Sequence, residues 1–262
     1  MLAGGWLEAA LFGALAQSAL LVGALLVWKF PGLQRPVIVG GLMAFGAGAV
    51  ISAVSVDLVA VSYDEAGALP TAIGIAIGCL LYFGIIALLE RRGRTELPGE
   101  LVEAEVQEGH SHGATAKEAR NLTIGMVVDG VPESIAVGLT LHTATVGVSA
   151  ALVGSIFISA IPEAIGIAAA MLAGGLVLGK VLLRFSFIVL IGAVFAALGY
   201  TLLANVSDSL QAIIQSIAAG ALLVVVINEM IPIAVRSVRA WAGVIGAAGF
   251  VFAAILTWAA GG

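Results

Sequence analysis

Charged residues are scarce in this sequence. Of its 262 residues, only 10% are Asp, Glu, Lys or Arg, whereas 61% are hydrophobic. A typical soluble domain has about 25% charged residues, because its surface has to be hydrated. The composition therefore excludes a soluble globular protein and indicates a polytopic membrane protein.

Cysteine and basic residues are also few. The single cysteine, Cys79, excludes an intrachain disulfide and a thiolate metal cluster within one chain. The 11 Lys and Arg residues and the net charge of −5 leave no basic patch large enough to follow a phosphate backbone, so we expect no nucleic-acid partner. The sequence also lacks H-E-x-x-H, G-x-S-x-G and the phosphate-binding G-x-x-x-x-G-K-[ST] pattern. We therefore expect no enzymatic activity and no ATP hydrolysis.

Hydrophobic runs occupy most of the chain. A helix needs about 20 apolar residues to cross a bilayer. The sequence provides eight such segments, at about 6–28, 37–61, 69–89, 121–142, 146–173, 185–204, 209–231 and 240–259. The runs are continuous, whereas the strands of a transmembrane barrel would be shorter and would alternate. We predict one domain over residues 1–262, an all-α polytopic membrane protein of eight transmembrane helices embedded in the lipid bilayer, with a cytoplasmic loop at 93–119.

The positions of lysine and arginine predict the orientation of these helices. All 11 lie in or beside the connections that follow the first, third, fifth and seventh predicted helices. Cytoplasmic connections carry an excess of basic residues. We therefore predict a multi-pass protein of the plasma (cytoplasmic) membrane with both termini outside.

Acidic residues lie at mid-membrane depth in the fourth and fifth predicted helices. Asp129 and Glu133 are four residues apart in the fourth, and Ser159 and Glu163 have the same spacing in the fifth. Residues at this spacing share one face of a helix. A carboxylate at the centre of a membrane helix costs about 2.5–3.5 kcal/mol on insertion scales, so several of them indicate a function. The structural alternative is a set of protonated acids that hydrogen-bond between helices.

A proline directly precedes each of these glutamates. Pro132 and Pro162 each remove a backbone donor and clash with the carbonyl four residues earlier, which predicts two broken helices with free carbonyls near Val128 and Ile158. No Lys or Arg lies inside a predicted span to neutralise the acids. A bound cation that alternates with protons would do so. We therefore expect a divalent metal ion as the transported substrate and no organic cofactor.

The two proline segments resemble motifs of the ZIP (Zrt/Irt-like) family of divalent-metal transporters. That family has His-Asn-x-Pro-Glu-Gly in its fourth helix and His-x-x-Pro-Glu-Gly in its fifth, where this chain has DGVPES at 129–134 and SAIPEA at 159–164. The chain thus resembles a divergent member that lacks both histidines. The resemblance implies eight helices in a 3+2+3 inverted-repeat bundle, and it allows a homodimer.

The resemblance also implies a ligand set for the transported ion. Glu133 and Glu163 would be metal ligands, and Asp129 and Ser159 would take the two histidine positions. Oxygen ligands suit Mn, Mg and Ca better than imidazole does, whereas imidazole suits Zn. We therefore expect an ion of the Zn, Mn or Fe class, with less selectivity for zinc than is usual in the family.

An internal repeat relates the second and seventh predicted helices. Gly48-Ala49 precedes Asp57 by nine residues, and Gly220-Ala221 precedes Glu229 by nine. The two helices are predicted to run in opposite directions, which is typical of the inverted repeats of secondary transporters. Asp57, Asn228 and Glu229 are therefore candidates for a gate or a secondary site. Capping at the membrane interface is the alternative.

Two of the three histidines lie in the predicted cytoplasmic loop. His110 and His112 stand beside glutamates and could bind a divalent metal weakly. Two histidines fall short of a closed structural site, and an ordinary solvated loop is the alternative.

Two other functions fit the same residues. The fold could carry protons, a monovalent cation or a small cationic solute through the same carboxylates. It could also be a membrane sensor without transport, in which the acids only hold helices together. Competition by divalent metals would separate the first alternative from metal transport. Loss of stability without loss of function in Glu133→Gln would indicate the second.

Overall fold

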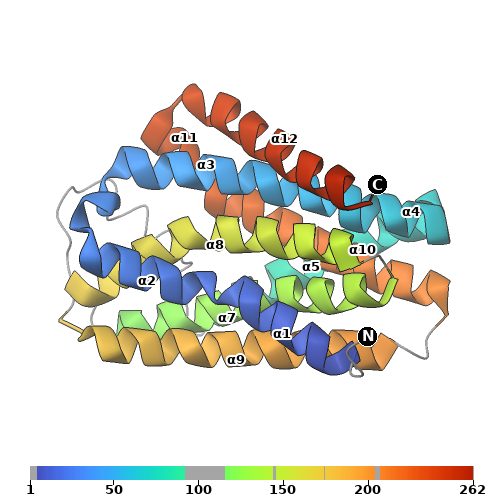
Figure 1. Cartoon of the computed structure of the whole chain (residues 1–262), viewed down its shortest axis with the longest axis horizontal. Coiled ribbons are helices and arrows are strands. Elements are labelled where there is room, and N and C mark those ends of the chain that lie inside the picture. Colours follow the sequence, from blue (N-terminus) through green and yellow to red (C-terminus); the bar gives the residue numbers. More distant parts are fainter. Residues whose placement is uncertain (1–4, 92–115, 144–145, 174, 204–206, 262) are drawn as a thin grey trace.

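The computed structural model of the chain describes residues 5–91, 116–143, 146–173, 175–203 and 207–261. Within these ranges every regular element is a helix, and no strand occurs (Figure 1). The elements are α1 (Gly5–Gln17), α2 (Ala19–Lys29), η1 (Pro31–Gln34), α3 (Pro36–Ala53), η2 (Val54–Val59), α4 (Ala60–Ala66), α5 (Ala68–Arg91), α7 (Ala116–Thr143), α8 (Val146–Ala173), α9 (Leu178–Leu203), α10 (Asp208–Val225), η3 (Val226–Met230), α11 (Ile231–Val238) and α12 (Trp241–Gly261). The all-α architecture is as predicted.

Six helical segments of the described residues are long and apolar enough to cross a membrane. They are Gly5–Lys29, Pro36–Ala66, Ala68–Leu88, Leu178–Leu202, Ser209–Val238 and Trp241–Ala259. α7 contributes a shorter apolar stretch, Gly130–Leu141. These segments support a multi-pass α-helical membrane protein. The two further spans, in α7 and α8, remain a prediction.

Several helix bounds differ from those expected. α7 begins at Ala116 and so takes in the end of the predicted 93–119 loop, because Ala-Lys-Glu-Ala-Arg is a run of good helix formers. α9 begins at Leu178 rather than near 185. The helix predicted to end at 231 continues through η3 and past Pro232 to Val238.

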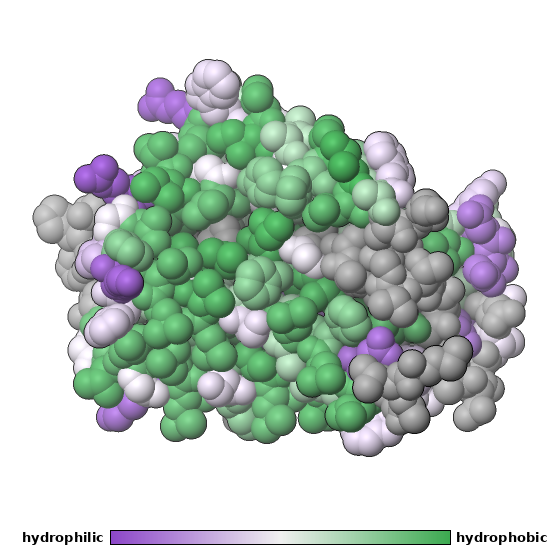
Figure 2. All heavy atoms as spheres, viewed as in Figure 1, coloured by the Kyte–Doolittle hydropathy of each residue, from purple (hydrophilic) through white to green (hydrophobic). Residues whose placement is uncertain are grey.

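Large apolar side chains cover the outside of the bundle. On α9, Leu183, Phe187, Leu190, Val194 and Leu198 recur at helical spacing, and each is 41–72% exposed. Figure 2 shows apolar atoms over most of the visible face. An apolar surface this large is a poor match for water and a good match for lipid chains.

Charges gather at the two ends of the bundle. The C-terminal ends of α2 and α11 and the N-terminal end of α9 carry Lys29, Arg236 and Lys180, and all three ends lie on the left of Figure 1. The end of α4, which carries Asp64 and Glu65, lies on the right, where α1 begins and α12 ends. The surface is therefore apolar in the middle and charged at both ends, as a membrane-spanning bundle requires.

Small residues let neighbouring helices approach closely. A Cβ atom on Gly48 of α3 would fall on the carbonyl oxygen of Gly246 in α12. A Cβ atom on Gly78 of α5 would fall on the carbonyl oxygen of Ile217 in α10 in the same way. Close backbone contact at small residues is a main source of helix association in lipid. It accounts for glycines such as Gly48 and Gly78, which lie where two helices touch.

The helices divide into two groups by their packing. In the first group, α9 packs on α1 and α7, and α2 packs on α8. In the second group, α3 packs on α12 and α11, and α10 packs on α5 and α4. α8 joins the groups by packing on α3 and α12, and α7 joins them by packing on α10.

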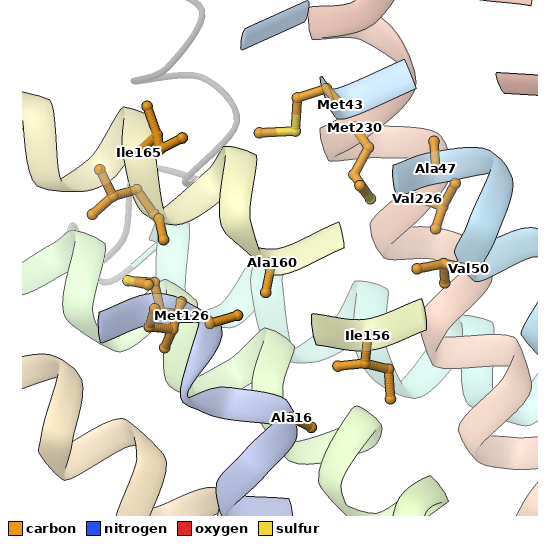
Figure 3. Packing of buried hydrophobic residues seen from close by; sticks show 14 of the residues in the cluster. Ala16, Met43, Ala47, Val50, Met126, Ile156, Ala160, Ile165, Val226 and Met230 are labelled. Carbon is orange, nitrogen blue, oxygen red and sulfur yellow. The ribbon is translucent and has the colours of Figure 1, made fainter. Parts of the chain in front are cut away.

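The contact between the two groups is apolar. Figure 3 shows Ile156 and Ala160 of α8 in the same buried cluster as Met43, Ala47 and Val50 of α3. All five side chains are at most 6% exposed. The groups therefore meet over a contact in which buried apolar side chains of α8 and α3 pack together.

Candidate cation site

The proline segments do not break their helices. α7 runs from Ala116 to Thr143 with Pro132 inside it, and α8 runs from Val146 to Ala173 through position 162. The expectation of two broken helices was therefore wrong in this respect. A proline removes one hydrogen bond of the ladder, and the bonds on either side can keep the helix continuous. Polar side chains on helix faces, rather than loose helix ends, build the site.

Glu133 receives a hydrogen bond from the first helix. Nε2 of Gln17, the last residue of α1, lies 3.2 Å from Oε2 of Glu133 and 3.5 Å from the carbonyl oxygen of Gly130. Gln17 is 3% exposed, and Glu133 is half-buried. No ion pair joins Glu133 to a lysine or arginine among the described residues. The carboxylate is thus held by a neutral amide.

Two glycines make room for the Gln17 side chain. A Cβ atom on Gly130 of α7 would lie 3.1 Å from Nε2 of Gln17, and one on Gly192 of α9 would lie 2.6 Å from its Cγ. The Ser134 hydroxyl donates to the Gly130 carbonyl at 2.7 Å. Gln17 therefore sits in a close-packed polar position between α7 and α9.

The first predicted span is divided at Ser18 into α1 and α2, and its two halves contact different proline segments. α1 ends at Gln17, and the Ser18 hydroxyl donates to the carbonyl of Leu15 at 2.6 Å before α2 begins. α2 then packs on α8, where a Cβ atom on Gly23 would lie 3.0 Å from the carbonyl oxygen of Ile161, next to Pro162. One helix, interrupted at Ser18, thus contacts the segment of Glu133 with its first half and the segment of Glu163 with its second.

Gln17 was not among the residues expected in the site. The signal available in the sequence was a single amide in the otherwise apolar stretch from Leu11 to Trp28. An amide buried in a membrane helix needs a partner, so this position could have been marked as polar. The partner itself could not be read, because Gln17 and Glu133 are 116 residues apart.

Most of the predicted ligands cannot be compared with the structure. The side chains of Asp129, Ser159 and Glu163 lie outside the described residues, although their backbones belong to α7 and α8. Among the described residues, no three His, Cys, Asp or Glu side chains come together in a group that could hold a metal ion. The set of Asp129, Glu133, Ser159 and Glu163 therefore stays a prediction.

The remaining predicted residues fall in different places. His110 and His112 lie outside the described residues, and so does the side chain of Glu229. Asn228 is exposed. Asp57 is 1% exposed and so lies inside the bundle.

Asp57 joins three helices of the second group. Its Oδ2 accepts a long hydrogen bond, 3.4 Å, from the hydroxyl of Thr257 in α12. Its backbone carbonyl accepts one of 3.2 Å from Nε2 of Gln215 in α10. Its Oδ1 is buried and has no partner among the described residues. Asp57 is therefore a buried polar contact point rather than a solvated group at a helix end.

Two π-helical segments occupy the positions that the internal repeat relates. η2 contains Asp57, and η3 contains Asn228 and Glu229. π-helical turns are rare and often occur at functional sites, because the wider turn redirects side chains and leaves backbone groups free. The two π-helical turns therefore agree with a functional role for these residues, although no hydrophobic pattern in the sequence predicted the turns.

The bond from Thr257 to Asp57 predicts a measurable contribution to stability. Thr257→Val keeps the shape of the side chain and removes the only hydroxyl of α12 that bonds to Asp57. We expect a loss of about 0.6–1.7 kcal/mol, the range for hydrogen bonds between membrane helices. Thr201→Val is the matched control, because the exposed Thr201 bonds within its own helix. Thermal unfolding in detergent measures both, and equal melting temperatures for the two variants would refute the contribution.

Comparisons with known proteins add no relative. The sequence matches no protein-family model, and no curated protein matches it either. The functional argument therefore depends on the residues and their geometry.

Proposed function

We propose that this protein transports a divalent metal cation across a membrane, through a carboxylate site on α7 and α8. One observation carries the proposal. Glu133, on a helix of a membrane protein, is bonded to the neutral amide of Gln17 and to no described cationic side chain. A carboxylate in this position needs a proton or a cation to balance its charge.

The donor set favours a divalent ion. Glu133 would share the ion with Glu163, Asp129 and Ser159, which the sequence places at matching positions of two neighbouring helices. Several carboxylates and oxygen donors suit Mn(II) and Fe(II), and Zn(II) also accepts carboxylates. The ion is therefore of the Zn, Mn or Fe class.

The packing supports an inverted repeat of eight spans. α3 of the second span packs on α12 of the eighth, and α10 of the seventh span packs on α5 of the third. These two contacts correspond to each other if the repeat relates the second span to the seventh and the third to the eighth. In the same way, α7 of the fourth span packs on α9 of the sixth, and α8 of the fifth span packs on α2 of the first. These contacts correspond if the repeat relates the fourth span to the fifth and the sixth to the first. The two π-helical segments also correspond, because η2 lies in the second span and η3 in the seventh. Secondary transporters with such repeats carry their substrate site at the interface of the repeats.

Alternating access would come from a movement of one helix group against the other. The contact between α8 and α3 is formed by buried apolar side chains, which can slide past one another more easily than polar groups that are bonded to each other. Basic residues at one end of the bundle support a cytoplasmic location for that end, with both termini outside, in the plasma membrane. A homodimer through exposed apolar helix faces is compatible with this arrangement.

Flux measurements on the purified protein in sealed liposomes separate the candidate functions. A metal-sensitive dye and a pH-sensitive dye inside the liposomes report divalent ions and protons in parallel. Metal transport predicts a signal from the metal dye that a second divalent ion, to which the dye does not respond, competes away. Proton flux that divalent ions leave unchanged would favour the alternative cargo.

The residues at the two histidine positions of the resembled motifs predict the selectivity. Asp129→His with Ser159→His replaces two oxygen donors by imidazoles, which favour zinc. We expect the ratio of zinc to manganese uptake to rise by roughly tenfold, within the range that single ligand-shell changes produce. An unchanged ratio in a folded variant would mean that these positions do not face the ion.

A further inference from the structure

We propose that Gln17 is a specificity-determining residue of the cation site. Its amide N–H holds Glu133 when the site is empty, and its amide oxygen turns to the cation when the site is loaded. The inference rests on the proposed function, because it takes Glu133 as a cation ligand.

The chemistry of the neighbours fixes the orientation of the amide. Nε2 lies 3.2 Å from a carboxylate oxygen of Glu133 and 3.5 Å from the carbonyl oxygen of Gly130, and both of these are acceptors. An amide NH₂ has two hydrogens to donate, whereas the amide oxygen has none. With Glu133 ionised, the nitrogen therefore lies on this side.

A bound cation would reverse this orientation. Once an oxygen of Glu133 coordinates a metal ion, the N–H group beside it faces positive charge. The last torsion of a glutamine is broad and roughly two-fold, so a half-turn exchanges the nitrogen for the oxygen without moving the rest of the side chain. The amide oxygen then adds a neutral ligand next to Glu133.

An amide oxygen is a hard ligand. Asn and Gln carbonyl groups are common in calcium sites, and oxygen donors in general suit Mn(II), Mg(II) and Ca(II). Imidazole at the same place would instead suit Zn(II). Gln17 therefore biases the site towards the harder divalent ions.

Gln17 lies at the junction between α1 and α2. The residue ends α1, and α2 follows Ser18 and packs on α8 at Ile161 and Ala164. A change of partner at Gln17 therefore occurs at the one interruption of the helix that contacts both proline segments.

Metal binding by purified variants tests the inference. We would titrate the full chain in detergent with MnCl₂ and with ZnCl₂ and determine both dissociation constants by calorimetry, for the wild type, Gln17→Leu, Gln17→His, Glu133→Gln and Thr140→Val. Thr140 is the matched control, because it is 0% exposed, lies on the same helix as Glu133 and bonds only to its own helix at Ala136.

The expected result is a change in the ratio of the two constants. Gln17→Leu should weaken manganese binding roughly tenfold, the scale for residues that orient or complete a metal site, and weaken zinc binding less. Gln17→His keeps a donor for Glu133 and should shift the ratio towards zinc by a similar factor. Thr140→Val should leave the ratio unchanged. A wild-type ratio in both Gln17 variants would overturn the inference, and the histidine variant keeps the test valid if the leucine variant fails to fold.

The same titration separates the two proposals. If the wild type binds neither ion, both proposals fall. If the wild type binds, Glu133→Gln abolishes the binding and the Gln17 variants keep the wild-type ratio, then only the inference about Gln17 is wrong.

Discussion

Replacing both glutamates, as Glu133→Gln with Glu163→Gln, should abolish metal uptake while the protein stays folded. Glutamine has nearly the shape of glutamate, so packing on α1 and α2 should change little. Its neutral side chain no longer attracts a cation into the membrane, where the charge of the ion must be balanced. We expect uptake by the double variant to equal that of liposomes without protein.

A matched control removes two carboxylates elsewhere. Asp64→Asn with Glu65→Gln changes two exposed acids at the end of α4, so it lowers the negative charge of the protein by the same amount. Uptake should persist in this control. Uptake by the Glu133/Glu163 variant at the level of the control, with both proteins folded by thermal unfolding, would disprove the site.

A leucine at Gly48 should destabilise the second helix group more than any other single change considered. A Cβ atom at this position would fall on the carbonyl oxygen of Gly246, and a backbone atom cannot rotate out of the way. α3 and α12 would have to separate along their contact. We expect a loss of about 3 kcal/mol, at the upper end of ordinary overpacking, or roughly 10 °C in melting temperature.

Gly84→Leu is the matched control for the change at Gly48. Gly84 lies in α5, and a Cβ atom there would meet nothing within 4 Å. Leucine also has a higher helix propensity than glycine, so this variant should melt at or above the wild-type temperature. Equal melting temperatures for the two leucine variants would show that α3 and α12 do not pack closely at Gly48.

Hydropathy predicted the fold class, because bilayer thickness constrains the length of an apolar helix. The bounds of α8 agree with those expected, and α5 differs by one or two residues. Prediction was poorer where short-range propensity decides, as at Ala116, where good helix formers extend a helix beyond its apolar run.

The candidate site was harder to predict, because its partners are distant in sequence. The spacing of acids and prolines marked Glu133, but the amide of Gln17 reaches it only through the packing of α1 on α7. The contacts of Asp57 with α10 and α12 likewise join residues that are far apart in sequence, so no local pattern encodes them.

Uptake by the wild-type protein in proteoliposomes, measured with Zn, Mn, Fe, Co, Cd, Mg and Ca in turn, tests the central claim most directly. Metal transport predicts protein-dependent flux of at least one of these ions, stronger for Mn or Fe than for Mg or Ca, and reduced when a second transported ion competes. Flux of none of the seven ions, from protein that is folded and in sealed liposomes, would contradict it.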